Sequence, residues 1–162
     1  MAISNVAIAN RALQKLGAKR IESLTENSPN ARSMNAAFAI VRDAELRRYT
    51  WSFAIKRASI AADGAGPEWN DWNRYGLPND FIALIRDDET DTFMDWKIEG
   101  LYILSADASP LKIRYLAQID DPTFYDPVFV GAFSMKLASE TCEEITQSTS
   151  KRWRSHGSHG RP

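Results

Sequence analysis

The chain has 162 residues, of which 44% are apolar and 25% charged, and its formal net charge is −1. This length and composition fit one soluble globular domain with a real hydrophobic core. The balanced charge excludes the strongly basic field that would make nucleic acid the main partner. It also excludes the acidic excess that is typical of disordered chains.

Cysteine usage and apolar runs limit where the protein resides. Cys142 is the only cysteine, so no disulfide can form within the chain and secretion gains no support. The N-terminal segment 1–6 lacks the basic and apolar regions of a signal peptide. No apolar run reaches the roughly 20 residues that span a membrane. We therefore expect the protein to reside in the cytoplasm until it assembles with partners.

Two helices are predicted in the first 50 residues. The first covers residues 4–16, where Ser4 or Asn5 can cap the N-terminus and Gly17 can end the helix in a left-handed conformation. The second begins at Ser28 and Pro29, a cap followed by proline at the first helical position, and continues for about 20 residues. Its apolar period runs through Met34, Phe38, Val41 and Ala44 or Glu45. The charged residues expected mostly on other faces are Arg32, Arg42, Asp43, Glu45, Arg47 and Arg48.

The middle of the chain, residues 51–119, predicts a small antiparallel β-meander. From Trp51 to Ala62 apolar and polar residues alternate, which indicates a strand with one buried side. Turn residues follow at 63–67, and further strands are predicted at 81–86, 93–99, 101–105 and 111–119.

A third helix is predicted to begin at Asp126 and Pro127 and to end near Gln147. The apolar residues assigned to its period are Phe129, Phe133, Met135, Leu137, Ala138 and Ile145, with Cys142 nearby. The remaining residues, 148–162, are small, polar and basic, and we expect them to be disordered.

The predicted fold class is α+β, formed by one domain over residues 1–147. Its helical part, 3–50 and 126–147, would form a bundle, and its β part, 51–119, would form the meander.

No catalytic residue, cofactor or metal is expected, and the chain is not predicted to be an enzyme. The only histidines, His156 and His159, have glycine or serine neighbours that cannot hold a preorganised metal or triad geometry. The segment from Gly64 to Gly66 lacks the Gly-Lys-Ser/Thr of a phosphate loop. An acidic run lacks the spacing of a calcium loop and reads as a solvated turn. That run contains Asp87, Asp88, Glu89 and Asp91.

Three other groups of residues allow more than one interpretation. Trp69, Trp72 and Tyr75 lie beside Arg74 and favour an interface or core role over a platform for sugars or bases. A basic group at the first helix is either solvated or contacts an acidic partner or DNA. It comprises Arg11, Lys15, Lys19 and Arg20. Glycoside hydrolysis would need two carboxylates across a cleft. The available ones are Glu68, Asp71, Glu140, Glu143 and Glu144.

Four motifs, in this order and spacing, resemble the tail tubular protein A family, the head–tail adaptor or gatekeeper ring proteins of short-tailed bacteriophages and prophages. They are Asn-Arg-Ala-Leu…Gly-Ala at 10–18, Arg-Asp-x-x-Leu-Arg at 42–47, Trp-x-Phe-Ala-x-x-Arg-Ala at 51–58 and Tyr-x-Leu-Pro-x-Asp at 75–80. The similarity covers residues 3–145. Residues 151–162 depart from the family, whose members continue with a longer C-terminal helix.

The resemblance implies a structural virion protein of the tail or neck, present in the host cytoplasm before assembly. It implies a homo-oligomeric, dodecameric ring that joins the portal protein to the tail nozzle or tube protein. DNA would pass through its channel without sequence-specific binding, and no membrane would be involved. The interface residues expected on this basis are Arg11, Lys15, Arg42, Arg47, Trp51, Trp69, Trp72, Arg74 and Tyr75. The alternatives are a cell-wall hydrolase associated with a phage tail and a small ligand-binding module.

Overall fold

The computed structural model describes residues 3–85 and 95–156, with side chains up to Gln147. It divides the chain into two compact units. The helical unit contains Met1–Arg48 and Asp120–Pro162, and the β unit contains Tyr49–Ile119. The division falls close to the predicted boundary between the helical and β parts of the sequence, and each unit is described by itself below.

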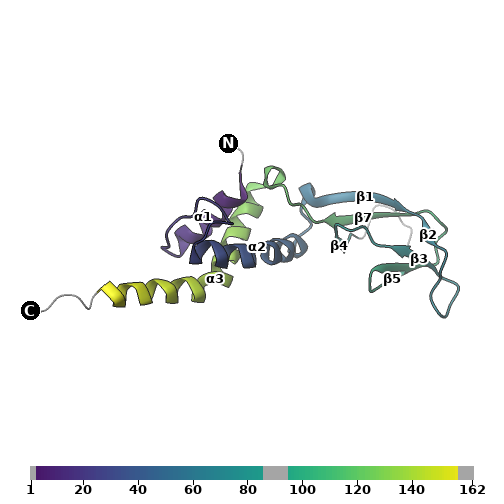
Figure 1. Cartoon of the computed structure of the whole chain (residues 1–162). Helices are drawn as coiled ribbons and strands as arrows, with labels where there is room; N and C mark the ends of the chain where they lie inside the picture. The colour runs from purple at the N-terminus through teal and green to yellow at the C-terminus, as the bar shows by residue number, and fades with distance from the viewer. Residues whose placement is uncertain (1–2, 86–94, 157–162) are drawn as a thin grey trace, which may run out of the picture. The chain divides into compact units, whose positions relative to one another are not determined.

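Within the described residues, the helical unit consists of three α-helices and one short 3-10 helix (Figure 1). They are α1 (Asn5–Lys15), α2 (Pro29–Arg48), η2 (Pro122–Phe124) and α3 (Pro127–His156). Helix α3 packs against both α1 and α2. Because the β unit is inserted between α2 and α3 in the sequence, the helical unit is built from two distant segments of the chain.

Capping side chains fix where the helices begin, as the sequence predicts. The Ser4 hydroxyl accepts a hydrogen bond from the N–H of Ala7 at 3.1 Å, and the Ser28 hydroxyl accepts one from Ala31 at 3.2 Å. The Asp126 carboxylate accepts one from Val128 at 2.7 Å. Each bond satisfies a donor of the first turn that has no partner within the helix.

An aromatic column forms the centre of the helical unit. Phe38 of α2 meets Phe133 of α3 edge to face, with ring centroids 4.9 Å apart. Phe133 contacts Phe129, and Phe129 contacts Tyr125 at 4.9 Å. These rings are at most 6% exposed, so the predicted apolar periods of α2 and α3 meet here.

The predicted end of the third helix is wrong. Helix α3 continues to His156, so the segment 148–156 is helical rather than disordered. Thr141 and Thr146 precede this segment within the helix, and their hydroxyls donate to the carbonyls of Leu137 and Cys142 one turn earlier. The expectation that residues 151–162 do not continue the helix is therefore also wrong up to His156.

The part of the β unit that the structure describes contains a 3-10 helix, η1 (Ser52–Ala54), and seven strands. The strands are β1 (Ile55–Ile60), β2 (Ala62–Asp63), β3 (Asn73–Gly76), β4 (Phe81–Leu84), β5 (Trp96–Glu99), β6 (Tyr102–Ser105) and β7 (Leu111–Ala117). The predicted strand from Trp51 is wrong in its first part. Residues 52–54 form a helical turn, so the strand begins at Ile55.

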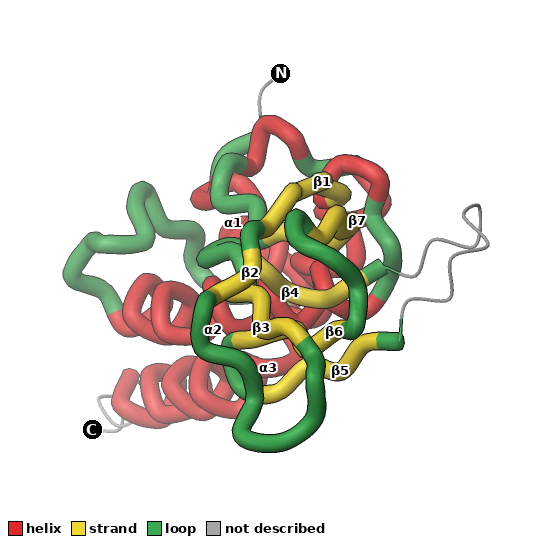
Figure 2. The backbone as a smooth tube through the Cα atoms, turned by 90° about the vertical axis from the view of Figure 1, so that its right-hand side faces the viewer, coloured by secondary structure: helices red, strands yellow, loops and turns green. Residues whose placement is uncertain are grey.

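All of these strands pair in antiparallel fashion. They form two sheets (Figure 2). The first sheet has the order β1-β7-β4, and its register pairs Ile55 with Leu116 and Ile60 with Leu111. The second has the order β2-β3-β6-β5. Its hairpin between β5 and β6 turns at Gly100, where the φ of +60° suits glycine.

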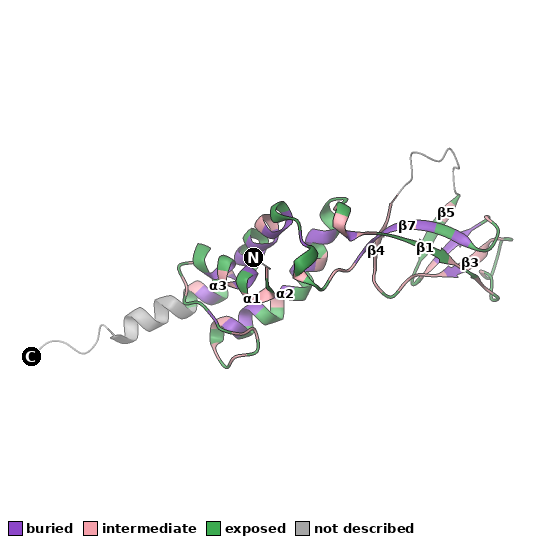
Figure 3. Ribbon diagram, turned by 90° about the horizontal axis from the view of Figure 1, so that it is seen from above, coloured by how far each residue is buried: buried purple, intermediate pink, exposed green. Residues whose placement is uncertain are grey.

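Both sheets contribute to one core, and Figure 3 shows its buried residues along β7 and β3. The central residues are Tyr75, Ile103, Leu111, Ile113, Tyr115 and Ala117. The predicted alternation of β7 is confirmed, because Leu111, Ile113 and Tyr115 are buried while Lys112 is exposed. The α+β fold class is thereby confirmed, with a helical bundle and an antiparallel β part. The acidic segment 87–91 lies outside the described residues.

Candidate interaction surfaces

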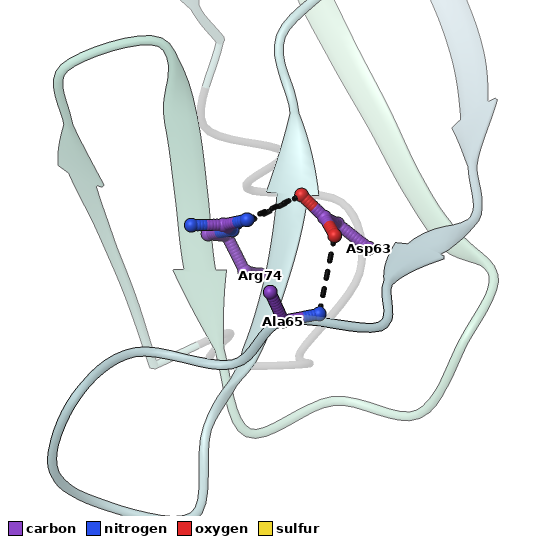
Figure 4. Close-up of polar contacts among 3 residues, drawn as sticks. All are labelled: Asp63, Ala65 and Arg74. Carbon is purple, nitrogen blue, oxygen red and sulfur yellow. Dashed lines mark hydrogen bonds and ion pairs between the residues drawn. The ribbon is translucent and has the colours of Figure 1, made fainter.

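The second sheet has a polar and aromatic face built around Arg74. Its guanidinium binds one carboxylate oxygen of Asp63 through Nε at 3.1 Å and Nη2 at 2.7 Å. The other oxygen accepts the N–H of Ala65 at 3.1 Å, as Figure 4 shows. The Ala65 hydrogen bond, followed by Arg74, lowers the pKa of Asp63 below its ordinary value. The hydrogen bond between Asp63 and Ala65 closes the turn after β2. This turn contains the segment from Gly64 to Gly66, which lacks the sequence of a phosphate loop.

Two cations cover two aromatic rings on the same face. Arg74 lies over the ring of Tyr102 with its guanidinium carbon 4.4 Å from the centroid, and Lys97 lies 5.5 Å from the centroid of Trp72. Arg74, Lys97 and Tyr102 share this face because the register pairs Arg74 with Leu104 and Leu104 with Lys97. Both cations are therefore engaged within the unit, and their contacts stabilise the sheet.

The predicted aromatic cluster is not a single surface. Tyr75 is completely buried, and its hydroxyl donates to the carbonyl of Asp107 at 2.6 Å. It belongs to the core because it pairs with Ile103 on the inner face of the sheet. Trp72 is half-buried, whereas Trp69 is 76% exposed. The expectation that Tyr75 lies at an interface is therefore wrong, and Trp69 is the exposed aromatic of the group.

Arg42 is also buried, contrary to the prediction that it lies on an exposed face. Its Nε is 2.8 Å from Asp43, and its Nη1 is 2.6 Å from Asp120 at the start of the returning chain. These two carboxylates supply acceptors that allow a guanidinium to leave water. Glu45, one turn further along α2, is only 2% exposed as well. Arg42 is thus a fold-stabilising residue.

The other predicted interface residues remain accessible to different degrees. Arg11 and Lys15 are exposed on α1, and Arg47 is exposed near the end of α2. Trp51 is half-buried, with its ring between those of Tyr49 at 5.6 Å and Phe53 at 6.1 Å. Arg11, Lys15 and Arg47 belong to the helical unit, whereas Trp51 belongs to the β unit together with Arg74.

Helix α2 has a second apolar side that faces solvent. Ala36, Ile40 and Ala44 follow one another at intervals of four residues and are all exposed. Ile40 is 74% exposed, although it lies between the buried residues Phe38 and Val41. We call Ala36, Ile40 and Ala44 the α2 outer face. Its composition differs from the polar outer side that is usual for a helix in a monomeric protein.

Helix α3 has a comparable side, which the sequence interpretation missed. Val128 and Met135 are 70% and 61% exposed, and the half-buried Ala132 lies between them at helical spacing. We call Val128, Ala132 and Met135 the α3 outer face. Ser139, which is exposed one turn after Met135, extends this face with a small polar side chain. Assigning Met135 to the buried period is wrong, because Met135 lies two residues from both Phe133 and Leu137 and so faces away from them.

Metal ligands and paired carboxylates are the catalytic groups to consider in the described residues. No group of three or more His, Cys, Asp or Glu side chains among them is placed to hold a metal ion. The carboxylates considered for glycoside hydrolysis are all exposed, and Glu140 forms an ion pair with Lys136 at 2.7 Å. Within the same described ranges, every helix is too short or too polar to cross a membrane.

Comparison with known proteins gives no assignment, since neither a protein-family model nor a curated protein matches the sequence.

Proposed function

We propose that this protein is a structural head-to-tail adaptor of a short-tailed bacteriophage or prophage. It would join the portal protein to the tail nozzle or tube as a homo-oligomeric ring that encloses the DNA exit channel. The observation that carries this proposal is the pair of exposed apolar faces on α2 and α3. A protein whose work is assembly needs such faces, because burying them supplies the free energy of association.

The roles of residues in the four family-like motifs also support the proposal. The Asn10 side chain holds the backbone of Ile21, accepting from its N–H at 2.9 Å and donating to its carbonyl at 2.8 Å. The buried Arg42 forms the ion pairs with Asp43 and Asp120 described above, and Ala54 is fully buried. Asp80 accepts hydrogen bonds from Lys56 at 2.7 Å and Tyr115 at 2.9 Å. The motifs therefore contain residues that hold the fold, so a resemblance in them is a resemblance in architecture.

The test is to mix the purified chain with the portal protein encoded near it and to measure the native mass of the product. Addition of a defined number of copies to each portal ring is the expected result, and the mass gives that number. A folded chain that leaves the mass of the portal ring unchanged would refute the adaptor role. A variant with Leu101→Ser, a change at a 76% exposed position of the β unit, is the control for nonspecific apolar adsorption.

A further inference from the structure

Strand β5 lies at an edge of the second sheet. The order of that sheet is β2-β3-β6-β5, so β6 is the only strand paired with β5 among the described residues (Figure 2). An edge strand presents backbone N–H and C=O groups that can bind a further strand. The second sheet can therefore be extended at β5.

The hydrogen bonds on the far side of β6 show which backbone groups of β5 point outward. The N–H of Leu77 donates to the carbonyl of Leu101 at 2.9 Å, so every second residue from Leu101 along β6 directs its backbone groups toward β3. Tyr102 therefore directs its groups toward β5, where it is paired with Glu99. Because this direction alternates along a strand, the N–H and C=O of Ile98 point away from β6. Neither group has a hydrogen-bond partner in the part of the chain that the structure describes.

The side chain of Ile98 also has apolar surface that its own copy leaves uncovered. It lies opposite Ile103, a completely buried residue of the core, on the inner face of the sheet. Ile98 is nevertheless 40% exposed, because β5 is the last strand on this side. A strand added at β5 would cover Ile98 and would satisfy its backbone groups at the same time.

The sequence of β5 complements itself when two copies pair in antiparallel fashion with Ile98 opposite Ile98. This register places Lys97 of each copy opposite Glu99 of the other, because the two residues flank Ile98. Side chains at such positions, where the ladder has no hydrogen bonds, approach most closely, and opposite charges there are stabilising. Both residues are exposed, and neither forms an ion pair within the described ranges. The contact of Lys97 with the Trp72 ring still leaves ammonium donors for a carboxylate.

From these observations we propose that the free protein forms a dimer in which β5 of one copy pairs with β5 of a second copy. The two-fold axis passes beside Ile98, and the N–H of each Ile98 donates to the carbonyl of the other. Such a contact is isologous and closes at two copies, so it does not build a ring whose neighbours are related by one rotation. The dimer is a state of the chain before assembly and lies beyond the adaptor role proposed above.

The first test is sedimentation velocity of the full chain at rising concentration, without portal protein. The contact is short, so we expect the wild type to dimerise with a dissociation constant of roughly 10 µM to 1 mM. Lys97→Glu gathers four carboxylates in the contact and Glu99→Lys gathers four ammonium groups, so each variant alone should dimerise about tenfold more weakly. An equal mixture should form a one-to-one dimer of wild-type strength, because every ammonium group again faces a carboxylate.

Two matched controls repeat these charge changes outside β5. Lys112→Glu and Glu68→Lys alter exposed residues of the same unit, and both variants should dimerise like the wild type. Far-UV circular dichroism of all the variants checks that they fold.

The register is tested by cysteine substitution in a Cys142→Ser background. Ile98→Cys should form a disulfide between copies when an oxidant is added, because directly opposed residues of a hydrogen-bonded pair have Cα atoms about 5.5 Å apart. Lys112→Cys provides a cysteine at an exposed position of β7 and should not cross-link.

Four results would overturn the proposal. The first is a wild type that stays monomeric up to about 1 mM, which would leave the edge to a different partner. The second is dimerisation of equal strength in the wild type and in Lys97→Glu. The third is a mixture that associates no more strongly than either variant alone although both fold. The fourth is equal cross-linking of Ile98→Cys and Lys112→Cys. The portal protein is absent from all these measurements, so a failure of the adaptor role would not alter them.

Discussion

Arg42 shows how a charged residue can be part of the core. Its side chain is 8% exposed, while the carboxylates of Asp43 and Asp120 are 39% and 76% exposed. The buried guanidinium therefore needs the two carboxylates as hydrogen-bond acceptors, whereas both carboxylates are exposed enough to be hydrated without it. The pair with Asp120 also fixes the point where the chain from β7 re-enters the helical unit.

Replacing Arg42 with methionine should lower the free energy of unfolding by roughly 1–3 kcal/mol. The loss stays moderate because neither carboxylate is left in a buried position. Arg32→Met is the matched control on the same helix, where Arg32 is exposed and bonded to Asn27, and it should change stability by less than about 0.5 kcal/mol. Urea titration of both variants measures the difference. Equal losses would show that Arg42 has no special role.

Two buried tyrosines make the folded state sensitive to alkali. Burial, together with the adjacent Asp80 carboxylate, raises the pKa of Tyr115 to about 12. Burial and the nearby charges of Asp120 and Asp43 raise the pKa of Tyr125 to about 12 against the opposing effect of Arg42. In the unfolded chain both phenols ionise near a pH of about 10. The unfolded state therefore loses protons first as the pH rises.

It follows that stability should be complete below a pH of about 10 and should fall as the pH rises to about 12. Tyr115→Phe should start less stable, since it lacks the hydrogen bond to Asp80, but should lose less stability across this range. Urea unfolding at several alkaline pH values measures how steeply the free energy of unfolding falls with pH for the wild type and for Tyr115→Phe. An identical dependence on pH in the variant and the wild type would show that ionisation of Tyr115 does not contribute to the loss of stability.

At the scale of single elements, the hairpin turn at Gly100 gives a clean test of turn geometry. Gly100 has a φ of +60° between β5 and β6, and a methyl group added to its Cα would meet no neighbouring atom within 4 Å. Gly100→Ala should therefore cost about 1 kcal/mol from backbone strain alone. Gly64→Ala is the control, because that site is equally open and has no positive φ, and it should leave stability unchanged or slightly higher. Thermal unfolding compares them, and equal effects would refute the strain argument.

The helix starts could be predicted from sequence because capping is local. Ser4, Ser28 and Asp126 each bond a backbone N–H two or three residues away, so a short stretch of sequence contains the whole interaction. The error at residues 51–54 arises where local information is not enough. A few alternating apolar residues fit a strand and a 3-10 turn equally well, and only the pairing of β1 with β7 decides where the strand begins.

The candidate surfaces were harder to predict because burial depends on distant residues. Arg42 is buried through Asp120, which follows it by the full length of the β unit. Tyr75 is buried because it pairs with Ile103 in the next strand of its sheet. For Ile40, Val128 and Met135 a signal was present in the sequence. Each is apolar but out of phase with the buried residues of its helix, and such positions indicate a second apolar face.

At the scale of the whole molecule, the chain has two separate sets of core residues. The helical unit encloses Leu137 with the aromatic column, and the β unit encloses Ile103 with Tyr75, and both aliphatic side chains are completely buried. A cavity in one core removes contacts from that unit alone. The two units should therefore respond independently to core mutations, which is a property of separately cooperative regions.

Leu137→Ala and Ile103→Ala test this independence, since each should lower the stability of its own unit by about 2–5 kcal/mol. Hydrogen exchange measured by mass spectrometry should show faster exchange in α1, α2 and α3 for Leu137→Ala, with the strands unchanged. Ile103→Ala should accelerate exchange in the strands and leave the helices as they were. Acceleration throughout the chain in either variant would mean that the two units unfold together.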